Sequence, residues 1–312
     1  MAGEVDGAHD VAGTPGATAS AEPAAPAAEP AAAPVAPGAA TAVLIGAGDI
    51  VDCGHPQDAA ATAALLDRLL AEADGTPAAV AALGDAAYDN GTPAEFARCY
   101  DPAWGRHKAR TRPAPGNHEY GTRGAAGYFG YFGPAAGEPG KGYYSYDLGA
   151  WHVVVLNSNC RQVGGCGPGS PQEQWLRADL AAHPAACTAA YMHHPRFSSG
   201  QHGSERELQA LWQALYDAGA DVVLAGHDHT YERFAPLDAQ GRLDPARGIR
   251  QFVAGTGGRS HYRFAAAQPN SEVRHSGTYG VLKLTLHPTS YAWQFVPVPG
   301  GTFTDSGSAP CH

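Results

Sequence analysis

The sequence lacks several features that would point to a membrane or a nucleic acid. No uninterrupted apolar stretch approaches the ~18 residues of a membrane-spanning helix, and there is no run rich in lysine and arginine. The formal net charge is −10, from 20 basic and 30 acidic side chains. We therefore expect no membrane span and no nucleic-acid-binding surface. The oligomeric state leaves no signal in the sequence.

The first residues also lack a basic segment followed by an apolar one, which is the pattern of a signal peptide. Residues 1–40 consist largely of alanine, proline, glycine and acidic residues, with almost no large side chain to bury. Such a segment cannot offset the entropy lost on ordering. We predict that residues 1–40 form a disordered tether and that residues 41–312 form one folded domain.

The six cysteines lack the Cys-x-x-Cys spacing that is common in zinc sites. An even number without that spacing favours disulfides formed in an oxidising compartment. On this interpretation the protein is secreted or held at the cell surface, and its signal peptide has been removed. The alternative is a cytosolic enzyme with buried, reduced thiols. The predicted pairs are Cys160 with Cys166, which flank a glycine-rich loop, Cys53 with Cys99, and Cys187 with Cys311.

Apolar runs of strand length alternate with segments whose large apolar residues recur at helical spacing. This pattern is typical of an α/β architecture, and the predicted fold is a four-layer αββα sandwich of two mixed β-sheets flanked by helices. The strands after residue 250 are expected to complete a second sheet. Strands are predicted at 42–45, 78–83, 143–147, 151–156, 188–192, 221–225, 251–254, 281–286 and 291–295, and helices begin at Pro56 and at capping boxes 170–173 and 204–207.

Polar side chains follow the carboxyl ends of these strands, where open α/β sheets usually bind ligands. After the apolar run 221–225, Gly226 permits a turn that lets His227 and His229 share one target. Alone, the two histidines are equally consistent with a structural pair. Other strand ends add carboxylates and an amide, which suit two metals of the Fe, Zn or Mn kind. The polar residues that these strand ends supply are Asp49, Asp85, Tyr88, Asn117, His118, His193, His227 and His229.

These residues lie in five ordered motifs that resemble those of the calcineurin-like metallophosphoesterases, in the variant found in purple acid phosphatases. The resemblance spans about residues 41–300. Most of that superfamily has a histidine two residues after the first aspartate, where this chain has Val51. Tyr88 stands where purple acid phosphatases have the tyrosinate ligand of a ferric ion. The motifs are Gly48-Asp49, Gly84-Asp85-x-x-Tyr88, Gly116-Asn117-His118-Glu119, His193-x-Pro195 and Gly226-His227-x-His229.

The resemblance implies that residues 41–312 are a metallophosphoesterase catalytic domain with two metal ions bridged by Asp85. Fe(III) would occupy the first site, and Fe(II), Zn(II) or Mn(II) the second. Without the resemblance, the two aspartates also suit ordinary glycine–aspartate turns and Tyr88 a packed aromatic position. The implied ligands are Asp49, Asp85, Tyr88 and His229 for the first metal, and Asp85, Asn117, His193 and His227 for the second.

The implied reaction is hydrolysis of a small-molecule phosphomonoester by attack of metal-bound hydroxide. His118 is adjacent to a predicted ligand, and His202 matches a substrate-binding histidine nine residues after His193. Both are expected to assist the leaving group. The alternatives are a supporting hydrogen-bonding role for His118 and a solvated role for His202. Two other functions fit the same residues. One is a phosphodiesterase that uses the same metals, and the other is a non-catalytic metal-binding scaffold.

Overall fold

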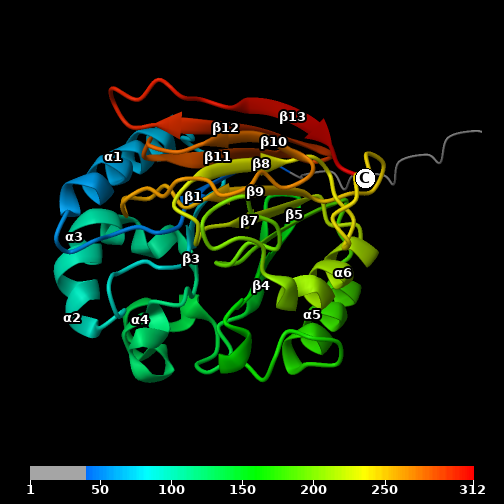
Figure 1. Cartoon of the computed structure of the whole chain (residues 1–312), viewed down its shortest axis with the longest axis horizontal. Helices are drawn as coiled ribbons and strands as arrows, with labels where there is room; N and C mark the ends of the chain where they lie inside the picture. Colours follow the sequence, from blue (N-terminus) through cyan, green and yellow to red (C-terminus); the bar gives the residue numbers. More distant parts are fainter. Residues whose placement is uncertain (1–39) are drawn as a thin grey trace, which may run out of the picture. The chain divides into compact units, whose positions relative to one another are not determined.

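The computed structural model describes residues 40–312, so the predicted tether lies outside the described residues except for Ala40. Within that range the strands form two mixed sheets (Figure 1). In spatial order, the six-stranded sheet contains β13 (Ser306–Pro310), β12 (Ser290–Pro297), β11 (Gly280–His287), β1 (Ala42–Ala47), β2 (Ala78–Leu83) and β3 (Thr111–Ala114). The seven-stranded sheet contains β10 (Ser271–His275), β8 (Tyr231–Phe234), β9 (Arg250–Ala254), β7 (Val222–Ala225), β6 (Cys187–Tyr191), β5 (Trp151–Val155) and β4 (Tyr144–Leu148).

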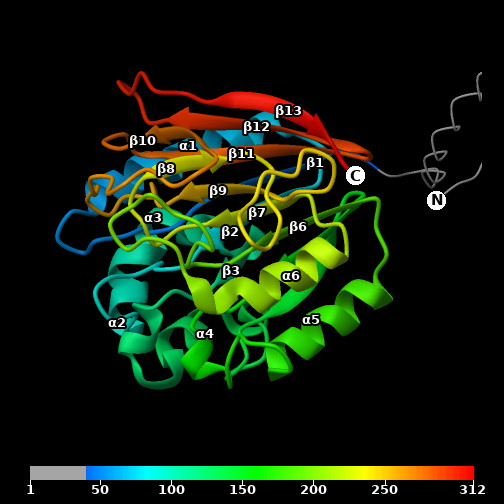
Figure 2. The ribbon, with the colours of Figure 1, turned by 45° about the vertical axis from the view of Figure 1, so that its right-hand side comes forward.

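Helices cover the outer faces of the two sheets. The longer α-helices are α1 (Pro56–Glu72), α4 (Ala126–Phe132), α5 (Pro171–Ala182) and α6 (Gln209–Asp217), and Figure 2 shows α5 and α6 side by side. None of the helices between residues 40 and 312 is long and apolar enough to cross a membrane. The short helices are α2 (Pro93–Glu95), η1 (Phe96–Tyr100), α3 (Asp101–Ala103), η2 (Trp104–Arg110), η3 (Glu119–Gly121), η4 (Arg123–Ala125), η5 (Gly133–Ala136), η6 (Cys160–Gln162) and η7 (Arg206–Leu208).

Three apolar clusters separate the four layers. In β1, Ile45 contributes to the cluster shared with α1, whereas Leu44 contributes to the cluster between the two sheets. The strand is buried on both faces, which explains why it reads as a continuous apolar run. A third cluster joins Val223 of β7 to Leu176 of α5 and Leu211 of α6. The predicted four-layer αββα sandwich is therefore confirmed.

Two local predictions were wrong. Of the strands after residue 250, β9 and β10 join the sheet of β6 and β7. In contrast, β11 pairs antiparallel with β1 and extends the first sheet together with β12. An alternating pattern specifies the buried face of a strand but not its neighbour. The helix expected at the 204–207 capping box begins only at Gln209, after η7. The Ser204 hydroxyl accepts a hydrogen bond from the Ser198 backbone instead.

All six cysteines form the predicted disulfides. Cys53 pairs with Cys99, and Cys160 pairs with Cys166 across the glycine-rich loop. Cys187, the first residue of β6, pairs with Cys311, which follows β13. The last bridge therefore joins a strand of one sheet to the chain that leaves the edge of the other.

Asp305 connects the segment before β13 to β8. Its carboxylate accepts hydrogen bonds from the Tyr231 hydroxyl (2.7 Å), from Arg233 Nε (2.7 Å) and from Trp293 Nε1 (3.3 Å). Burial alone would raise the pKa of Asp305, but the bonds from Arg233 and Tyr231 outweigh burial and hold the pKa below its usual value. The carboxylate is therefore stabilised in its ionised form in the folded protein.

We expect Asp305→Ala to lower the free energy of unfolding at pH 7 by about 3 kcal/mol, because the Arg233 guanidinium loses its buried partner. Since the folded-state pKa is lowered, this contribution is present above about pH 4 and is lost as the pH falls further. Urea unfolding of the wild type and of Asp305→Ala at pH 7 and pH 3 measures this contribution. A difference between the two proteins that does not shrink on acidification would contradict the role of the charge.

Candidate metal centre

Loops at the carboxyl ends of β1, β2, β3, β6 and β7 bring the predicted ligands together. The strands β1, β2 and β3 are mutually parallel, as are β6 and β7, so the ends of each group meet at one edge. Asp49, Asp85 and His227 have left-handed backbones, with φ of 60°, 49° and 71°. Such conformations are costly for residues other than glycine and cluster at functional sites. Three such backbones at one edge of the sheets fit a functional site.

Four of the predicted side chains meet around the hydroxyl of Tyr88, which is buried. This oxygen lies 2.8 Å from Asp49 Oδ1, 3.1 Å from Asp85 Oδ2 and 3.3 Å from His229 Nε2. His229 Nε2 is also 3.3 Å from Asp49 Oδ1. Tyr88 is thus part of the cluster rather than an unrelated packed aromatic.

The remaining predicted ligands surround Nε2 of His193, which is fully buried. This nitrogen lies 3.1 Å from Asn117 Oδ1, 3.2 Å from His227 Nδ1 and 3.2 Å from Asp85 Oδ2. Asp85 Oδ2 is therefore common to both groups, which is the position that a bridging carboxylate requires.

The far atoms of these side chains are held by the backbone. His193 Nδ1 lies 2.9 Å from the Leu83 carbonyl and His229 Nδ1 lies 2.6 Å from the Ser260 carbonyl. A carbonyl can only accept, so each Nδ1 carries a proton and, in the neutral ring, each Nε2 presents a lone pair to the centre.

The carboxylates are held in the same way. Asp49 Oδ2 accepts the backbone N–H of His227 (2.8 Å), and Asp85 Oδ1 accepts that of His118 (2.9 Å). The other oxygen of each aspartate is directed to the centre. Each of these two histidines and two aspartates is therefore oriented by a contact that leaves one atom available for a cation.

The buried acidic groups of the cluster favour nearby positive charge. Burial, together with Asp49 and Asp85, raises the pKa of Tyr88 well above its usual value. Burial alone would lower the pKa of His193, but Asp85 outweighs it and raises the pKa to about 10. Burial and the neighbouring His193 lower the pKa of His227. Bound cations would relieve this crowding of buried acceptors, and oxygen and imidazole donors match Fe, Zn or Mn.

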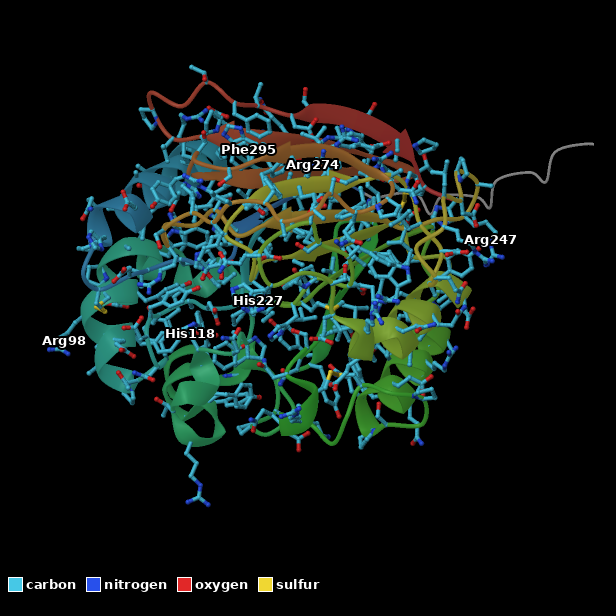
Figure 3. All side chains as sticks on the ribbon, viewed as in Figure 1. Arg98, His118, His227, Arg247, Arg274 and Phe295 are labelled. Carbon is cyan, nitrogen blue, oxygen red and sulfur yellow. A yellow bond between two sulfur atoms is a disulfide. The ribbon has the colours of Figure 1, made fainter. Side chains whose placement is uncertain are left out.

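His118 and His202 both lie beside this cluster. The His118 ring is 4.3 Å from the Tyr88 ring, and its Nδ1 lies 2.5 Å from the Asp89 carbonyl. The His202 ring is 4.4 Å from that of His227. Figure 3 shows His118 and His227 well inside the outline of the molecule, whereas Arg98 and Arg247 mark its periphery.

Four further residues contact the cluster without having been predicted. Glu119 is fully buried and accepts the backbone N–H groups of Asp85 and Gly116, so it fixes two ligand loops. Its place in the Gly-Asn-His-Glu motif was the available signal. Arg259 lies over the Tyr88 ring at 4.6 Å, and Tyr262 stacks on His229 at 4.0 Å. Both belong to a loop that no motif marks.

His194 is the fourth of these residues. Its ring lies 4.3 Å from that of His227, and its Nδ1 lies 2.7 Å from the Ser158 hydroxyl. Burial and the neighbouring His193 lower the pKa of His194 to about 3. His194 thus stays neutral and lies against the cluster, although only His193 of this pair matched the motif.

Comparison with known proteins finds a family match and several relatives. The calcineurin-like phosphoesterase family matches residues 44–231. Purple acid phosphatase 21 of Arabidopsis thaliana is 36% identical over 160 residues, which cover 48% of this chain and 35% of that protein. The chain thus spans about a third of the length of this relative.

Solved structures show the same fold. Purple acid phosphatase PPD1 from yellow lupin (Lupinus luteus) superposes with a TM-score of 0.68 and 19% identity, over 87% of this chain and 54% of that one. GAP50, described as the anchor in the inner membrane complex of Plasmodium, superposes with a TM-score of 0.66 and 13% identity, over 88% of this chain and 90% of that one. With its family match covering more than half of its residues, this chain belongs to the calcineurin-like phosphoesterase family.

Proposed function

We propose that this protein is a metal-dependent hydrolase of phosphomonoesters with a two-metal centre. The observation that carries the proposal is the sharing of Asp85 Oδ2, which is 3.1 Å from the Tyr88 oxygen in one group and 3.2 Å from His193 Nε2 in the other. A single carboxylate oxygen between two clusters of donors is suited to bridging two cations. The matches to purple acid phosphatases support the same activity.

The two groups of donors divide the ligands between two metals. With its proton displaced by a bound cation, the Tyr88 oxygen would be a hard anionic donor that favours Fe(III), and the mixed group around His193 suits Fe(II), Zn(II) or Mn(II). When bound, the cations would neutralise phosphoryl oxygens and lower the pKa of a water molecule into the neutral range. The first metal is assigned to Asp49, Asp85, Tyr88 and His229, and the second to Asp85, Asn117, His193 and His227.

His118 and His202 supply the remaining functions. His118 Nδ1–H donates a hydrogen bond to the Asp89 carbonyl, so Nε2 is the atom that can hold a proton for the leaving alkoxide. His202, whose ring lies 4.4 Å from that of His227, is placed to bind a phosphoryl oxygen or the leaving group. The substrate is a small-molecule phosphate ester, and the three disulfides support a secreted or cell-surface location.

Metal analysis and a visible spectrum of the isolated protein test the centre. We expect about two metal ions per chain and a charge-transfer band that Tyr88→Phe removes. Tyr262→Phe is the matched control, because Tyr262 also touches the His229 ring but is not among the proposed ligands. Two metals without a band would exclude a ferric phenolate, and a protein that binds no metal would contradict the proposal.

Activity measurements test the substrate class. An aryl phosphomonoester is expected to be hydrolysed faster than the matching aryl diester by the metal-loaded protein. The reverse ratio would assign a phosphodiesterase to the same centre. No turnover by protein with both metals bound would favour a non-catalytic scaffold.

A further inference from the structure

The aspartate between the two histidines of the last motif is directed toward a neighbouring loop. Asp228 is fully buried, and its Oδ2 lies 2.5 Å from the Ser198 hydroxyl, while its Oδ1 accepts the backbone N–H of His202 at 2.9 Å. His227 and His229, on either side, belong to the proposed metal centre. The segment 227–229 therefore carries two proposed metal ligands and also binds the backbone N–H of His202.

The loop from Ser198 to Gly203 is built around this carboxylate. The Ser198 hydroxyl also accepts the backbone N–H of Gly200 (2.9 Å). A Cβ at Gly200 would lie 2.1 Å from the carboxyl carbon of Asp228, so no side chain fits there. The close approach of loop and carboxylate thus explains why glycine occupies this position.

A second buried carboxylate holds the next residue of the same loop. Glu232 Oε2 accepts the backbone N–H of Ser199 (2.8 Å), and Oε1 accepts the hydroxyls of Ser199 and Ser271. The Ser199 hydroxyl accepts the backbone N–H of Gln268 in turn (2.8 Å). Glu232 therefore anchors the beginning of the loop, and Asp228 provides the contact that reaches His202 itself.

We propose that Asp228 is a positioning residue that holds His202 against the metal centre. The proposal rests on the proposed phosphatase function, because it gives His202 a role at the substrate. The Asp228 carboxylate makes two contacts with this loop, one with the Ser198 hydroxyl and one with the backbone N–H of His202. The His202 segment contains two glycines and would otherwise sample many conformations. The His202 ring lies 4.4 Å from that of His227 and 5.2 Å from that of Tyr262. Its position thus depends on the hydrogen bond between the His202 backbone and Asp228.

A double-mutant cycle with aryl phosphomonoester tests this role. We expect His202→Ala to lower kcat/KM by about 10²-fold. Asp228→Ala should cause a comparable loss, and the double variant should lose no more than His202→Ala alone. Metal content should stay unchanged in all three. Losses that multiply in the double variant, or loss of metal from Asp228→Ala, would overturn the proposal.

Two further variants separate positioning from general stability. Ser198→Ala removes one bond to the carboxylate and is the milder substitution should Asp228→Ala fail to fold. Asp221→Asn is the matched control, since Asp221 is also buried and accepts the backbone N–H groups of Thr188 and His312, at the other end of β7. It should lower stability and leave kcat/KM unchanged.

Amide hydrogen exchange reads the loop without any turnover. We expect faster exchange of residues 200–203 in Asp228→Ala and in Ser198→Ala, and not in Asp221→Asn. Unchanged exchange in the first two variants would overturn the proposal. A wild-type protein that shows no turnover would remove the proposed function. Faster exchange in Asp228→Ala than in the wild type would still support the positioning of His202 by Asp228.

Discussion

Replacement of Asp85 by alanine is expected to remove metal from the protein and to lower kcat/KM for a phosphomonoester by at least about 10³-fold. This exceeds the ~10–100-fold loss typical of a group that only supports a ligand. The reason is the place of Asp85 Oδ2 between the Tyr88 oxygen and His193 Nε2, so that one substitution takes an anionic donor from both groups. Elemental analysis after desalting and steady-state kinetics measure the two effects.

Asp49→Ala is the informative comparison. Asp49 Oδ1 lies 2.8 Å from the Tyr88 oxygen and 3.3 Å from His229 Nε2, whereas the ligand atoms of Asp49 and His193 come only within 4.8 Å of one another. We therefore expect this variant to lose the first metal and to retain the second, whereas Asp85→Ala loses both. An Asp85→Ala protein that keeps two metals and its turnover would show that the two groups of donors are independent of Asp85.

The layered fold was predictable because the pattern of apolar residues in a strand indicates which of its faces are buried. Ala42–Ala47 is apolar throughout, and both of its faces are covered, by α1 and by the second sheet. The neighbour of each strand was not predictable in the same way, and the late strands β11 and β12 were assigned to the wrong sheet. Ser204 misled for a different reason, because its hydroxyl serves the tertiary contact with Ser198 rather than a helix end.

The meeting of the proposed ligands was predictable because each follows a strand end that parallel pairing brings to a common edge. Glu119 and Asp228 lie inside the motifs, yet their work is to hold backbone N–H groups of other loops, which no local pattern reveals. Arg259 and Tyr262 reach the centre from a late loop. Sequence patterns thus locate the donors, whereas the groups that orient and cover them emerge only from tertiary contacts.

Removal of the Cys187–Cys311 disulfide, by replacing both residues with alanine, is expected to lower the free energy of unfolding by about 5 kcal/mol. The two cysteines are separated by 124 residues, so the bridge restricts a large loop in the unfolded chain. Native domains are commonly stable by about 5–15 kcal/mol, so this loss is a large share of the total. Urea unfolding of the two proteins under oxidising conditions measures the difference.

The Cys160–Cys166 bridge is the matched control, because its cysteines are separated by only 6 residues. Its removal should cost about 2 kcal/mol, since the entropy of loop closure grows with the logarithm of loop length. Equal losses for the two pairs would contradict this origin of the stability. Wild-type protein that unfolds at the same urea concentration with and without reductant would remove the stabilising role of all three bridges, and with it the argument for an oxidising compartment.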